Sequence, residues 1–427
     1  MREMKDSGIA WIGAMPRAWK MNTIAQIFLQ VKCKNTGLQE KNLLSLSYGK
    51  VKRKSIDTVE GLLPESFDGY NIIEKDDIVL RLTDLQNDHT SLRVGLAEER
   101  GIITSAYLTI RNRSNFCPKY LYYYLHSFDI AKGFYGMGAG VRQGLNWDGI
   151  KWLKILAPSV PEQERIAAFL DAECAEIDTV LEKTRASIEE YKKLKQAVIT
   201  QAVTKGIRGD RPMKGSGIEW IGEIPAGIPI SRVGLHFDIV LGKMLCSAPV
   251  DDNYTLESYY CAADVHFEGL SNGEKKKMWF SPDEKEQYCV KNGDLLVVEG
   301  GAGAGGCAIA ASTDVPIYIQ NSIMIVRSKG ISNIRYLRYL LECLVKKGYI
   351  DVVCNKATIP HFTKDKLAIV PFIVFSQSEQ EEIAEYLNEK CAGIDALIVK
   401  KQQYLTEIEN YKKSLIYEYV TGKKEVV

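Results

Sequence analysis

Polar side chains that can hydrogen-bond to the edges of nucleic-acid bases gather in a few short segments of this 427-residue chain. The segment Arg81–Arg93 (RLTDLQNDHTSLR) follows a strand-like run, and a second set follows a glycine-rich approach. Such side chains either form paired hydrogen bonds to base edges or are ordinary solvated loop residues. In the first half of the chain, the candidates for base contact are Arg81, Thr83, Gln86, Asn87, His89, Arg93, Arg142, Gln143 and Asn146.

Comparable segments occur in the second half of the chain. They are Glu299–Gly306, Gln320–Ser322 and Asn355–Thr358, the last followed by His361. Glycines in the first of them would let the backbone approach a ligand closely. The candidates here are Glu299, Gly301, Gly303, Gln320, Asn321, Asn355, Lys356, Thr358 and His361.

Motifs for catalysis or cofactor binding are not found in the sequence. The run Gly300–Gly306 (GGAGAGG) lacks the lysine and hydroxyl residue of a nucleotide-binding P-loop, and Cys307 follows it where a strand is expected. The acidic run Pro282–Lys285 is typical of a helix start. It does not indicate a nuclease metal site, because such a site needs carboxylates from separated segments. The five histidines are scattered without zinc-ligand spacing. We therefore expect no catalytic residue, no cofactor site and no metal site.

Composition limits the kind of molecule this is. The net charge of +1 does not favour a protein that grips DNA alone, because such proteins are usually distinctly basic. Local basic patches or partner proteins would have to supply most phosphate contacts. No apolar run reaches the roughly 20 residues of a membrane helix, and the start MREMKDSGIAWIG lacks the apolar core of a signal peptide. The expected location is the cytoplasm, which also suits ten cysteines without framework spacing.

One long helix is predicted over Pro161–Gly206, which has no proline after its first residue and no glycine before its last. Apolar residues recur there at steps of three, four or seven, as in a heptad seam. At about 1.5 Å per residue this helix would be on the order of 65 Å long and would need a partner for its apolar stripe. The seam residues are Ile166, Leu170, Ile177, Leu181, Ile188, Tyr191, Val198 and Ala202.

An internal repeat supplies that partner. Shifting the sequence by 217 residues aligns Gln163 with Gln380, and a shift of 209 aligns Ser7 with Ser216. Further aligned pairs are Ile166-Ala167 with Ile383-Ala384, Leu170 with Leu387, Cys174-Ala175 with Cys391-Ala392, Ile177-Asp178 with Ile394-Asp395, Val203-Thr204 with Val420-Thr421, and Trp11-Ile12-Gly13 with Trp220-Ile221-Gly222. The chain therefore alternates globule, helix, globule, helix.

The repeat predicts an α+β fold in which two pseudo-symmetric globular domains are separated by two long antiparallel coiled-coil helices. The linker after the first helix is too short to return, so the second helix must run back along the first. Thr421–Val427 should then lie near Ser7–Pro16. The expected domains are residues 1–158, the first helix 159–206, residues 207–375, and the second helix 376–427.

Each globule mixes strands with one helix. Strand-like runs include Asp77–Leu82 and Ile103–Ile110 in the first globule and Asp294–Val298 in the second. A helix is predicted over Pro118–Ser127, and Ile334–Leu344 is its counterpart. The first helix carries an aromatic stripe of Tyr120, Tyr123 and Tyr124, for which core packing is favoured over base stacking.

With the repeat established, the chain closely resembles the specificity subunit of Type I restriction-modification systems. The resemblance rests on the openings Ser7–Pro16 and Ser216–Pro225 (SGIxWIGxxP) and on the helix starts Glu162-Gln163 and Glu379-Gln380. Val203-Thr204-Lys205-Gly206 ends the first helix, whereas Val420-Thr421-Gly422-Lys423 exchanges the last two residues.

The resemblance implies a non-catalytic subunit with two target-recognition domains, each reading one half of a split sequence in double-stranded DNA. It also implies assembly with two methyltransferase subunits and with restriction subunits, which would bring S-adenosylmethionine and ATP. Exposed apolar residues beside the helix seam, Leu194, Leu397 and Tyr404, are the expected partner-binding residues. The alternatives are a recognition subunit of a modification-only system and a coiled-coil scaffold that presents two protein-binding domains.

Overall fold

The computed structural model describes residues 2–55, 66–85, 92–135, 137, 144–354 and 360–426. The chain divides into two compact units. Unit 1 comprises Met1–Arg185 and Gln402–Val427, and unit 2 comprises Ala186–Lys401. Each unit is described by itself.

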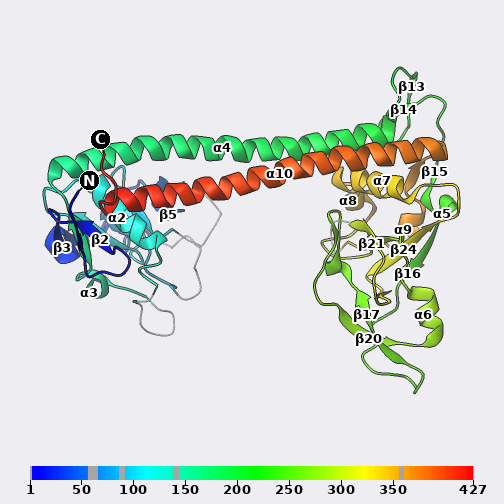
Figure 1. Ribbon diagram of the computed structural model, residues 1–427, viewed down its shortest axis with the longest axis horizontal. Coiled ribbons are helices and arrows are strands. Elements are labelled where there is room, and N and C mark those ends of the chain that lie inside the picture. The colour runs from blue at the N-terminus through cyan, green and yellow to red at the C-terminus, as the bar shows by residue number, and fades with distance from the viewer. Residues whose placement is uncertain are drawn as a thin grey trace. The chain divides into compact units, whose positions relative to one another are not determined.

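Two long helices run through both units: α4 (Val160–Lys205) and α10 (Gln377–Val420) (Figure 1). In unit 1, Asp178 of α4 pairs with Lys412 at 2.6 Å, whereas Arg185 further along α4 pairs with Glu409. In unit 2, Lys195 of α4 pairs with Asp395 at 2.7 Å. Rising residue numbers in α4 thus meet falling ones in α10, which confirms the antiparallel pairing. Most of the predicted seam is buried, namely Ile166, Leu170, Ile177, Leu181, Ile188 and Ala202.

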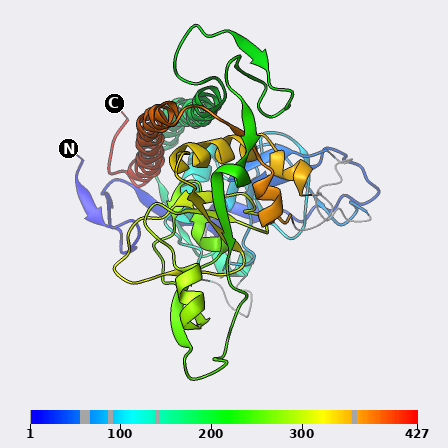
Figure 2. The same cartoon turned by 90° about the vertical axis from the view of Figure 1, so that its right-hand side faces the viewer.

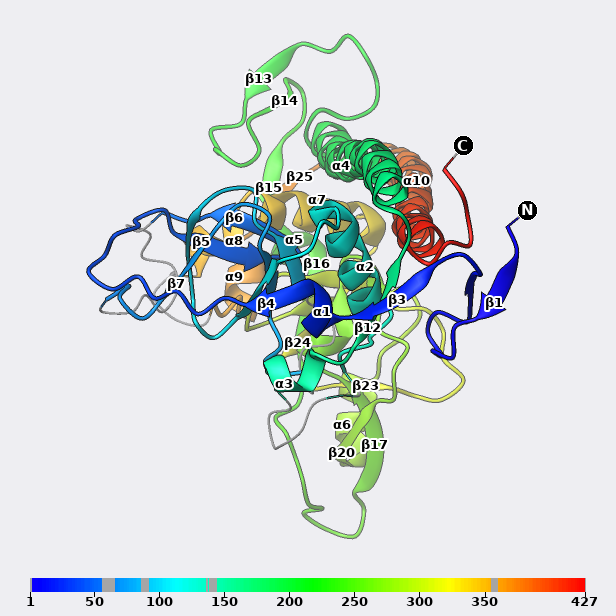
Figure 3. The ribbon, with the colours of Figure 1, turned by 90° about the vertical axis from the view of Figure 1, so that its left-hand side faces the viewer.

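Unit 1 is built on a four-stranded antiparallel sheet of order β4-β11-β8-β9. Helix α2 packs on this sheet and lies beside the ends of α4 and α10 that belong to unit 1 (Figure 3). Its elements before α4 are β1 (Met4–Asp6), β2 (Ala14–Pro16), β3 (Lys20–Thr23), α1 (Ile24–Ile27), β4 (Phe28–Gln30), β5 (Leu44–Ser47), β6 (Lys50–Arg53), β7 (Asn71–Ile73), β8 (Ile78–Leu80), β9 (Val94–Leu96), β10 (Gly101–Ile103), β11 (Leu108–Asn112), α2 (Pro118–Ile130), α3 (Trp147–Ile150) and β12 (Lys154–Ala157).

The single strand expected over Ile103–Ile110 is wrong. The run is divided into β10 and β11 by a turn in which the Tyr107 amide donates to the Thr104 carbonyl and the Ala106 amide donates to the Thr104 hydroxyl. A threonine hydroxyl competes with the strand ladder in this way. The two strands consequently join different sheets.

Unit 2 repeats this plan with a sheet of order β16-β24-β21-β22 and adds a smaller sheet, β20-β17-β23. Figure 2, which faces unit 2, shows the antiparallel pair β17 and β20 and the helix α6 projecting away from the helix pair. The elements between α4 and α10 are β13 (Met213–Gly215), β14 (Glu223–Pro225), β15 (Ile230–Arg232), α5 (Val233–His236), β16 (Phe237–Leu241), β17 (Thr255–Tyr260), the 3-10 turn η1 (Ala262–Asp264), β18 (Val265–His266), β19 (Gly269–Leu270), β20 (Lys276–Phe280), α6 (Pro282–Tyr288), β21 (Leu295–Val298), β22 (Cys307–Ile309), β23 (Tyr318–Ile319), β24 (Ile323–Ser328), α7 (Ile334–Lys346), α8 (Tyr349–Val353), α9 (Lys364–Ala368) and β25 (Pro371–Ile373).

Local sequence explains where several helices start. Ser281 caps α6 by accepting a hydrogen bond from the Glu284 amide, and Glu284 bonds back to the Ser281 amide. The helix-start interpretation of Pro282–Lys285 is therefore confirmed. Pro118 opens α2 at a position where a missing N–H costs nothing, and the Asn333 side chain caps α7.

The ends of α4 and α10 show how the exchanged glycine and lysine are accommodated. Gly206 and Gly422 both have positive φ, at 76° and 73°. A Cβ at Gly422 would lie 2.4 Å from the Pro16 side chain, so glycine is required there. Lys423 then donates to the carbonyls of Ile12 and Ala14. The C-terminal segment thus lies against the N-terminal one, as predicted.

Candidate nucleic-acid interface

Each unit contains the same ion pair between a buried aspartate and a partly exposed arginine, and it fixes the central strands. In unit 1 the Arg111 guanidinium donates to both carboxylate oxygens of Asp77, at 2.8 and 2.7 Å. In unit 2 Arg327 does the same to Asp294, at 2.8 and 2.6 Å. The carboxylates raise the pKa of both arginines by hydrogen bonding. Because each aspartate stands just before β8 or β21, this bidentate pair holds the start of the strand that leads to the predicted contact loops.

A buried tyrosine attaches the globule's own helix, α2 or α7, to one of the long helices. The Tyr120 hydroxyl donates to the carbonyls of Leu156 in β12 (3.0 Å) and Val420 in the last turn of α10 (3.3 Å). In unit 2 the Tyr336 hydroxyl donates to Ile373 of β25 (3.3 Å) and Val203 of α4 (3.0 Å). Burial raises the pKa of both phenols.

Tyr120, Tyr123 and Tyr124 are all buried, so the core-packing interpretation of the aromatic stripe is confirmed. The Tyr123 hydroxyl donates to Asp171 of α4 at 2.8 Å. Tyr339 donates to Asn388 of α10 in the same way, also at 2.8 Å.

The paired glutamines found in the repeat perform a matching task. The side chain of Gln163 accepts from the Cys117 amide at 3.0 Å and donates to the Pro158 carbonyl. Gln380 accepts from the Asn333 amide at 2.8 Å and donates to the Phe375 carbonyl. Both amides are almost fully buried. Each therefore joins the start of a long helix to the start of the globule's own helix.

In unit 2, two of the predicted segments and the predicted residue His361 meet at one end of the main sheet. Glu299 follows β21 directly, and its amide donates to the Ser322 carbonyl at 2.8 Å. The Phe362 amide donates to the Glu299 carbonyl at 2.6 Å, and the Gly301 amide donates to the Pro360 carbonyl at 3.1 Å. The segments Glu299–Gly306, Gln320–Ser322 and Pro360–Phe362 are therefore neighbours, and we call this end of the sheet the unit 2 loop face.

The side chains of the unit 2 loop face are partly exposed and make some hydrogen bonds with one another. The His361 imidazole lies 3.3 Å from a Glu299 carboxylate oxygen and its side chain is 61% exposed. The Gln320 side chain accepts a hydrogen bond from the Ser322 backbone amide. Its Nε2 donates to Oδ1 of the Asn321 side chain. Gly301 has a φ of 87° and open space at its Cβ position. This mixture of a carboxylate, an imidazole, amides and close backbone matches the groups that recognise base edges.

Unit 1 has a corresponding loop face. The Leu145 amide donates to the Leu82 carbonyl at 2.8 Å. At the repeat shift of 217 residues, Leu145 corresponds to Phe362 and Leu82 to Glu299, so the two units share this bond. Arg81–Leu85 thus lies beside Gly144–Asn146, so two of the predicted sets are brought together. Thr83 is exposed and Arg81 is half-buried. The Asn146 side chain is exposed and accepts from the Gly149 amide at 3.1 Å, capping α3.

Arg93 has a different role from the one expected. It is fully buried, and its guanidinium donates to the carbonyls of Arg81, Thr83 and Asp84 at 3.0, 2.8 and 3.3 Å. It also donates to the Tyr135 hydroxyl. We therefore assign Arg93 to holding the loop in place, not to contacting a base. The other candidates Gln86, Asn87, His89, Arg142, Gln143, Asn355, Lys356 and Thr358 lie outside the described residues.

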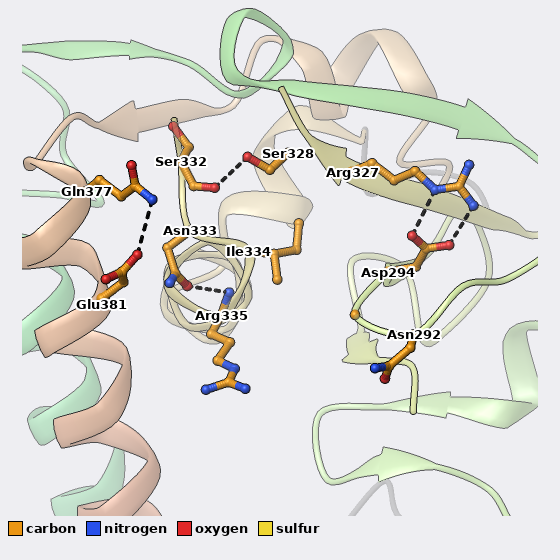
Figure 4. Close-up of a pocket in the computed structure, with 11 residues that line it drawn as sticks. Asn292, Asp294, Arg327, Ser328, Ser332, Asn333, Ile334, Arg335, Gln377 and Glu381 are labelled. Atoms are coloured by element: carbon orange, nitrogen blue, oxygen red, sulfur yellow. Dashed lines mark hydrogen bonds and ion pairs between the residues drawn. The ribbon is translucent and has the colours of Figure 1, made fainter. Parts of the chain in front are cut away.

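A polar pocket of about 330 Å³ occupies the opposite end of the unit 2 sheet (Figure 4). Its lining includes the Asp294–Arg327 pair and residues at the starts of α7 and α10. Dashed contacts in Figure 4 join Gln377 with Glu381 and Asn333 with Arg335. Because the ion pair recurs in unit 1, we interpret this pocket as part of the framework and not as a ligand site.

Residues predicted to bind partners lie exposed on the long helices. In unit 2, Leu194 is 49% and Leu397 is 43% exposed, and in unit 1 Tyr404 is 48% exposed. Val399 and Tyr411 are exposed as well. The flanks therefore offer apolar surface beyond the buried seam.

Three residues at the unit 2 loop face were not predicted from the sequence. Lys243, Met244 and Leu245 follow β16, and the Asn321 amide donates to the Lys243 carbonyl at 2.8 Å. The available signal was the end of an alternating strand pattern at Leu241-Gly242, followed by an adjacent apolar pair. Among the residues that the structure covers, no group of three or more His, Cys, Asp or Glu side chains is placed to hold a metal ion. No helix in the same part of the chain is long and apolar enough to span a membrane.

The two units repeat the same internal bonds and each has a polar loop face, and comparisons with known proteins show what part of the chain is similar to. Residues 268–407 match the family model of the Type I restriction modification DNA specificity domain. This range includes the three segments that define the unit 2 loop face, Glu299–Gly306, Gln320–Ser322 and Pro360–Phe362, but not Lys243–Leu245. No curated protein sequence matches the chain.

Two solved structures share the fold along nearly the whole chain. The first was described as the structural basis underlying complex assembly and conformational transition of the type I R-M system. It has a TM-score of 0.73 and 17% identity, and the match covers 96% of this chain and 99% of that one. The second is the crystal structure of the HsdS subunit from Thermoanaerobacter tengcongensis, with a TM-score of 0.52, 16% identity, and coverage of 96% and 98%. The match over residues 268–407 confirms the predicted resemblance to the specificity subunits of Type I restriction-modification systems, and the two structures show that the fold is shared along nearly the whole chain.

Proposed function

We propose that this chain is the DNA sequence-specificity subunit of a Type I restriction-modification complex and that each unit reads one half of a split target. The observation that carries the proposal is the unit 2 loop face. Three polar segments far apart in the sequence meet at one sheet end, and this end falls largely inside the matched specificity domain. The scaffold alternative is not favoured, because the matched domain is one for DNA specificity.

The proposed contacts follow from the chemistry of base edges. Amides such as Gln320 and Asn321 pair with adenine, and a carboxylate such as Glu299 accepts from the amino group of cytosine. Gly301 and Gly303 let the backbone come close to the duplex. In unit 1 the corresponding contacts are Arg81, Thr83 and Asn146, and the candidates outside the described residues stay part of the proposed set.

The proposed partners explain how a chain with a net charge of +1 can act on DNA. Two methyltransferase subunits would supply the catalytic residues and most contacts to phosphates, and restriction subunits would join the same complex. The exposed flanks of α4 and α10, with Leu194, Leu397 and Tyr404, are the proposed docking surface. The chain itself would position its partners on DNA without catalysing a reaction, in the cytoplasm.

A binding measurement with one matched pair of variants tests this proposal. The chain is reconstituted with its methyltransferase subunits, and affinity is measured for a duplex that carries the split site mapped from the methylated genome. Asn321→Ala should weaken binding by about 5- to 150-fold, since one good base contact contributes about 1–3 kcal/mol. Asn292→Ala, an exposed asparagine before β21, should leave affinity unchanged.

Two results would count against the proposal. The complex could show no preference for the split site over a scrambled duplex, which would remove DNA specificity from the chain. Alternatively, Asn292→Ala could weaken binding as much as Asn321→Ala, which would remove the loop face from the reading surface. Salt concentration must be held constant, because contacts to phosphates make affinity strongly salt-dependent.

A further inference from the structure

Two adjacent large aliphatic side chains stand exposed at the unit 2 loop face. Met244 is 75% exposed and Leu245 is 63% exposed, and Leu241 at the end of β16 is 40% exposed. Single exposed apolar residues are ordinary on protein surfaces. An adjacent pair at a polar sheet end is different, because it leaves apolar area in water beside side chains suited to hydrogen bonding.

The backbone on both sides of this pair is firmly held. The Lys243 amide donates to the Ile319 carbonyl at 3.2 Å, and the Lys243 carbonyl accepts from the Asn321 amide at 2.8 Å. On the other side, the Cys246 carbonyl accepts from the Trp279 amide at 3.0 Å. Met244 and Leu245 are thus the two residues between fixed points of a short segment.

The Lys243 side chain adds a second anchor. It is 10% exposed, its ammonium group pairs with Glu284, and it lies 4.9 Å from the Tyr254 ring centre and 5.4 Å from that of Phe280. Charge, hydrogen bonding and two aromatic faces together keep this lysine turned into the protein. The neighbouring Met244 and Leu245 therefore form the outer surface of the segment.

Close approach to the amide-bearing segment is built into the backbone. A Cβ at Gly242 would lie 2.5 Å from the Gln320 carbonyl oxygen, so only glycine fits there. Lys243 and Gln320 form a parallel β-bridge. The apolar pair consequently follows immediately after a residue that is bonded to Gln320-Asn321.

This juxtaposition is complementary to one base pair. In the major groove, adenine presents a donor and an acceptor that an asparagine or glutamine amide can match, and its partner thymine presents a 5-methyl group beside them. Amides next to exposed aliphatic groups offer the same two chemistries side by side. A guanine–cytosine pair has no methyl group in that place.

We propose that Met244 and Leu245 contact the 5-methyl group of a thymine in the half-site read by unit 2, in the same base pair whose adenine is contacted by Gln320-Asn321. The inference rests on the proposed function and adds the base that this surface selects. Met244 and Leu245 would then determine specificity through apolar contact with the methyl group, whereas Gln320 and Asn321 would do so through hydrogen bonds.

Replacing thymine by uracil tests the inference, because the two bases differ only in the methyl group. The reconstituted complex is titrated with mapped target duplexes in which each thymine of both half-sites is replaced singly by deoxyuridine. At one position the wild-type complex should lose about fourfold in affinity, the amount expected for burial of one methyl group. The double variant Met244→Ser, Leu245→Ser should bind thymine and uracil duplexes equally at that position.

Ile331→Ser is the matched control, because Ile331 is 68% exposed beyond the opposite end of β24. This variant should keep the fourfold preference for thymine. The inference is overturned if the wild-type complex binds every uracil duplex as tightly as the unmodified one, or if the double variant keeps the preference. If the wild-type complex shows no preference for the unmodified split site, the proposed function itself fails and the inference falls with it.

Discussion

Replacing Arg93 by lysine should loosen the loop face of unit 1 while leaving its sheet folded. The guanidinium binds three carbonyls within the turn that includes Asp84, whose φ is 56°. It also packs 5.0 Å from the Tyr135 ring centre. A lysine ammonium is a compact group and does not reproduce the planar fork of donors.

The expected cost follows from the bonds that are lost. Lysine would forfeit at least two hydrogen bonds from a charged donor, each contributing about 1.5–3 kcal/mol. A local loss of about 3 kcal/mol increases the population of the opened loop about 150-fold. Hydrogen exchange of the Arg81 amide, which donates to the Arg93 carbonyl, should accelerate by a similar factor. Binding should weaken for one half-site only.

Hydrogen exchange measured by mass spectrometry, together with affinity for duplexes altered in one half-site, provides the assay. Arg113→Lys is the matched control, because Arg113 is an exposed arginine of unit 1 whose side chain donates to the single carbonyl of Ala25. The reasoning is refuted if Arg93→Lys leaves both exchange and affinity unchanged. It is equally refuted if unit 2 exchanges faster to the same extent, since the change would then not be local.

Three further predictions concern partners, spacing and pH. Leu397→Asp with Tyr404→Asp should reduce co-purification of methyltransferase subunits, whereas Leu256→Asp, on an exposed site of β17, should not; unchanged stoichiometry would place docking elsewhere. Helices α4 and α10 run unbroken through the boundary between the units, so inserting four residues after Ala186 and four after Tyr404 should widen the methylated motif's gap by about one to two base pairs. A fixed gap would contradict this. Burial lowers the pKa of His126 to about 4. Below about pH 6.5 this imidazole is protonated in the unfolded state but stays neutral in the folded state until about pH 4. Unit 1 should therefore lose about 2 kcal/mol of unfolding free energy between pH 7 and pH 5, and His126→Gln should abolish this pH dependence in urea titrations.

The architecture could be predicted because the two halves of the sequence align over long stretches without gaps. The heptad residues Leu170 and Ile177 of α4 recur in α10 as Leu387 and Ile394, and an apolar stripe of that length requires a partner helix. The paired glutamines Gln163 and Gln380 pointed to equivalent helix starts, and the structure shows equivalent bonds there. Periodicity carries such information because it is repeated over many residues.

The binding surface was harder to predict because its contacts depend on segments far apart in the chain. The sequence placed Arg93 among polar neighbours, yet the fold turns it inward to hold three carbonyls. The single strand expected over Ile103–Ile110 failed at a threonine hydroxyl bond that no alternating pattern reveals. Met244 and Leu245 were not among the predicted residues, and only the bridge from Lys243 to Gln320 places them beside the amides.

The central claim is that each unit reads its own half of one split DNA sequence. The most direct measurement is a genome-wide map of methylated bases in cells that carry the complete system, with the wild-type chain and with Glu299→Ala, Asn321→Ala. The account predicts a wild-type motif of two defined halves with a fixed gap, and a variant motif that is relaxed in one half only. A contiguous motif, or a variant in which both halves change together, would contradict it.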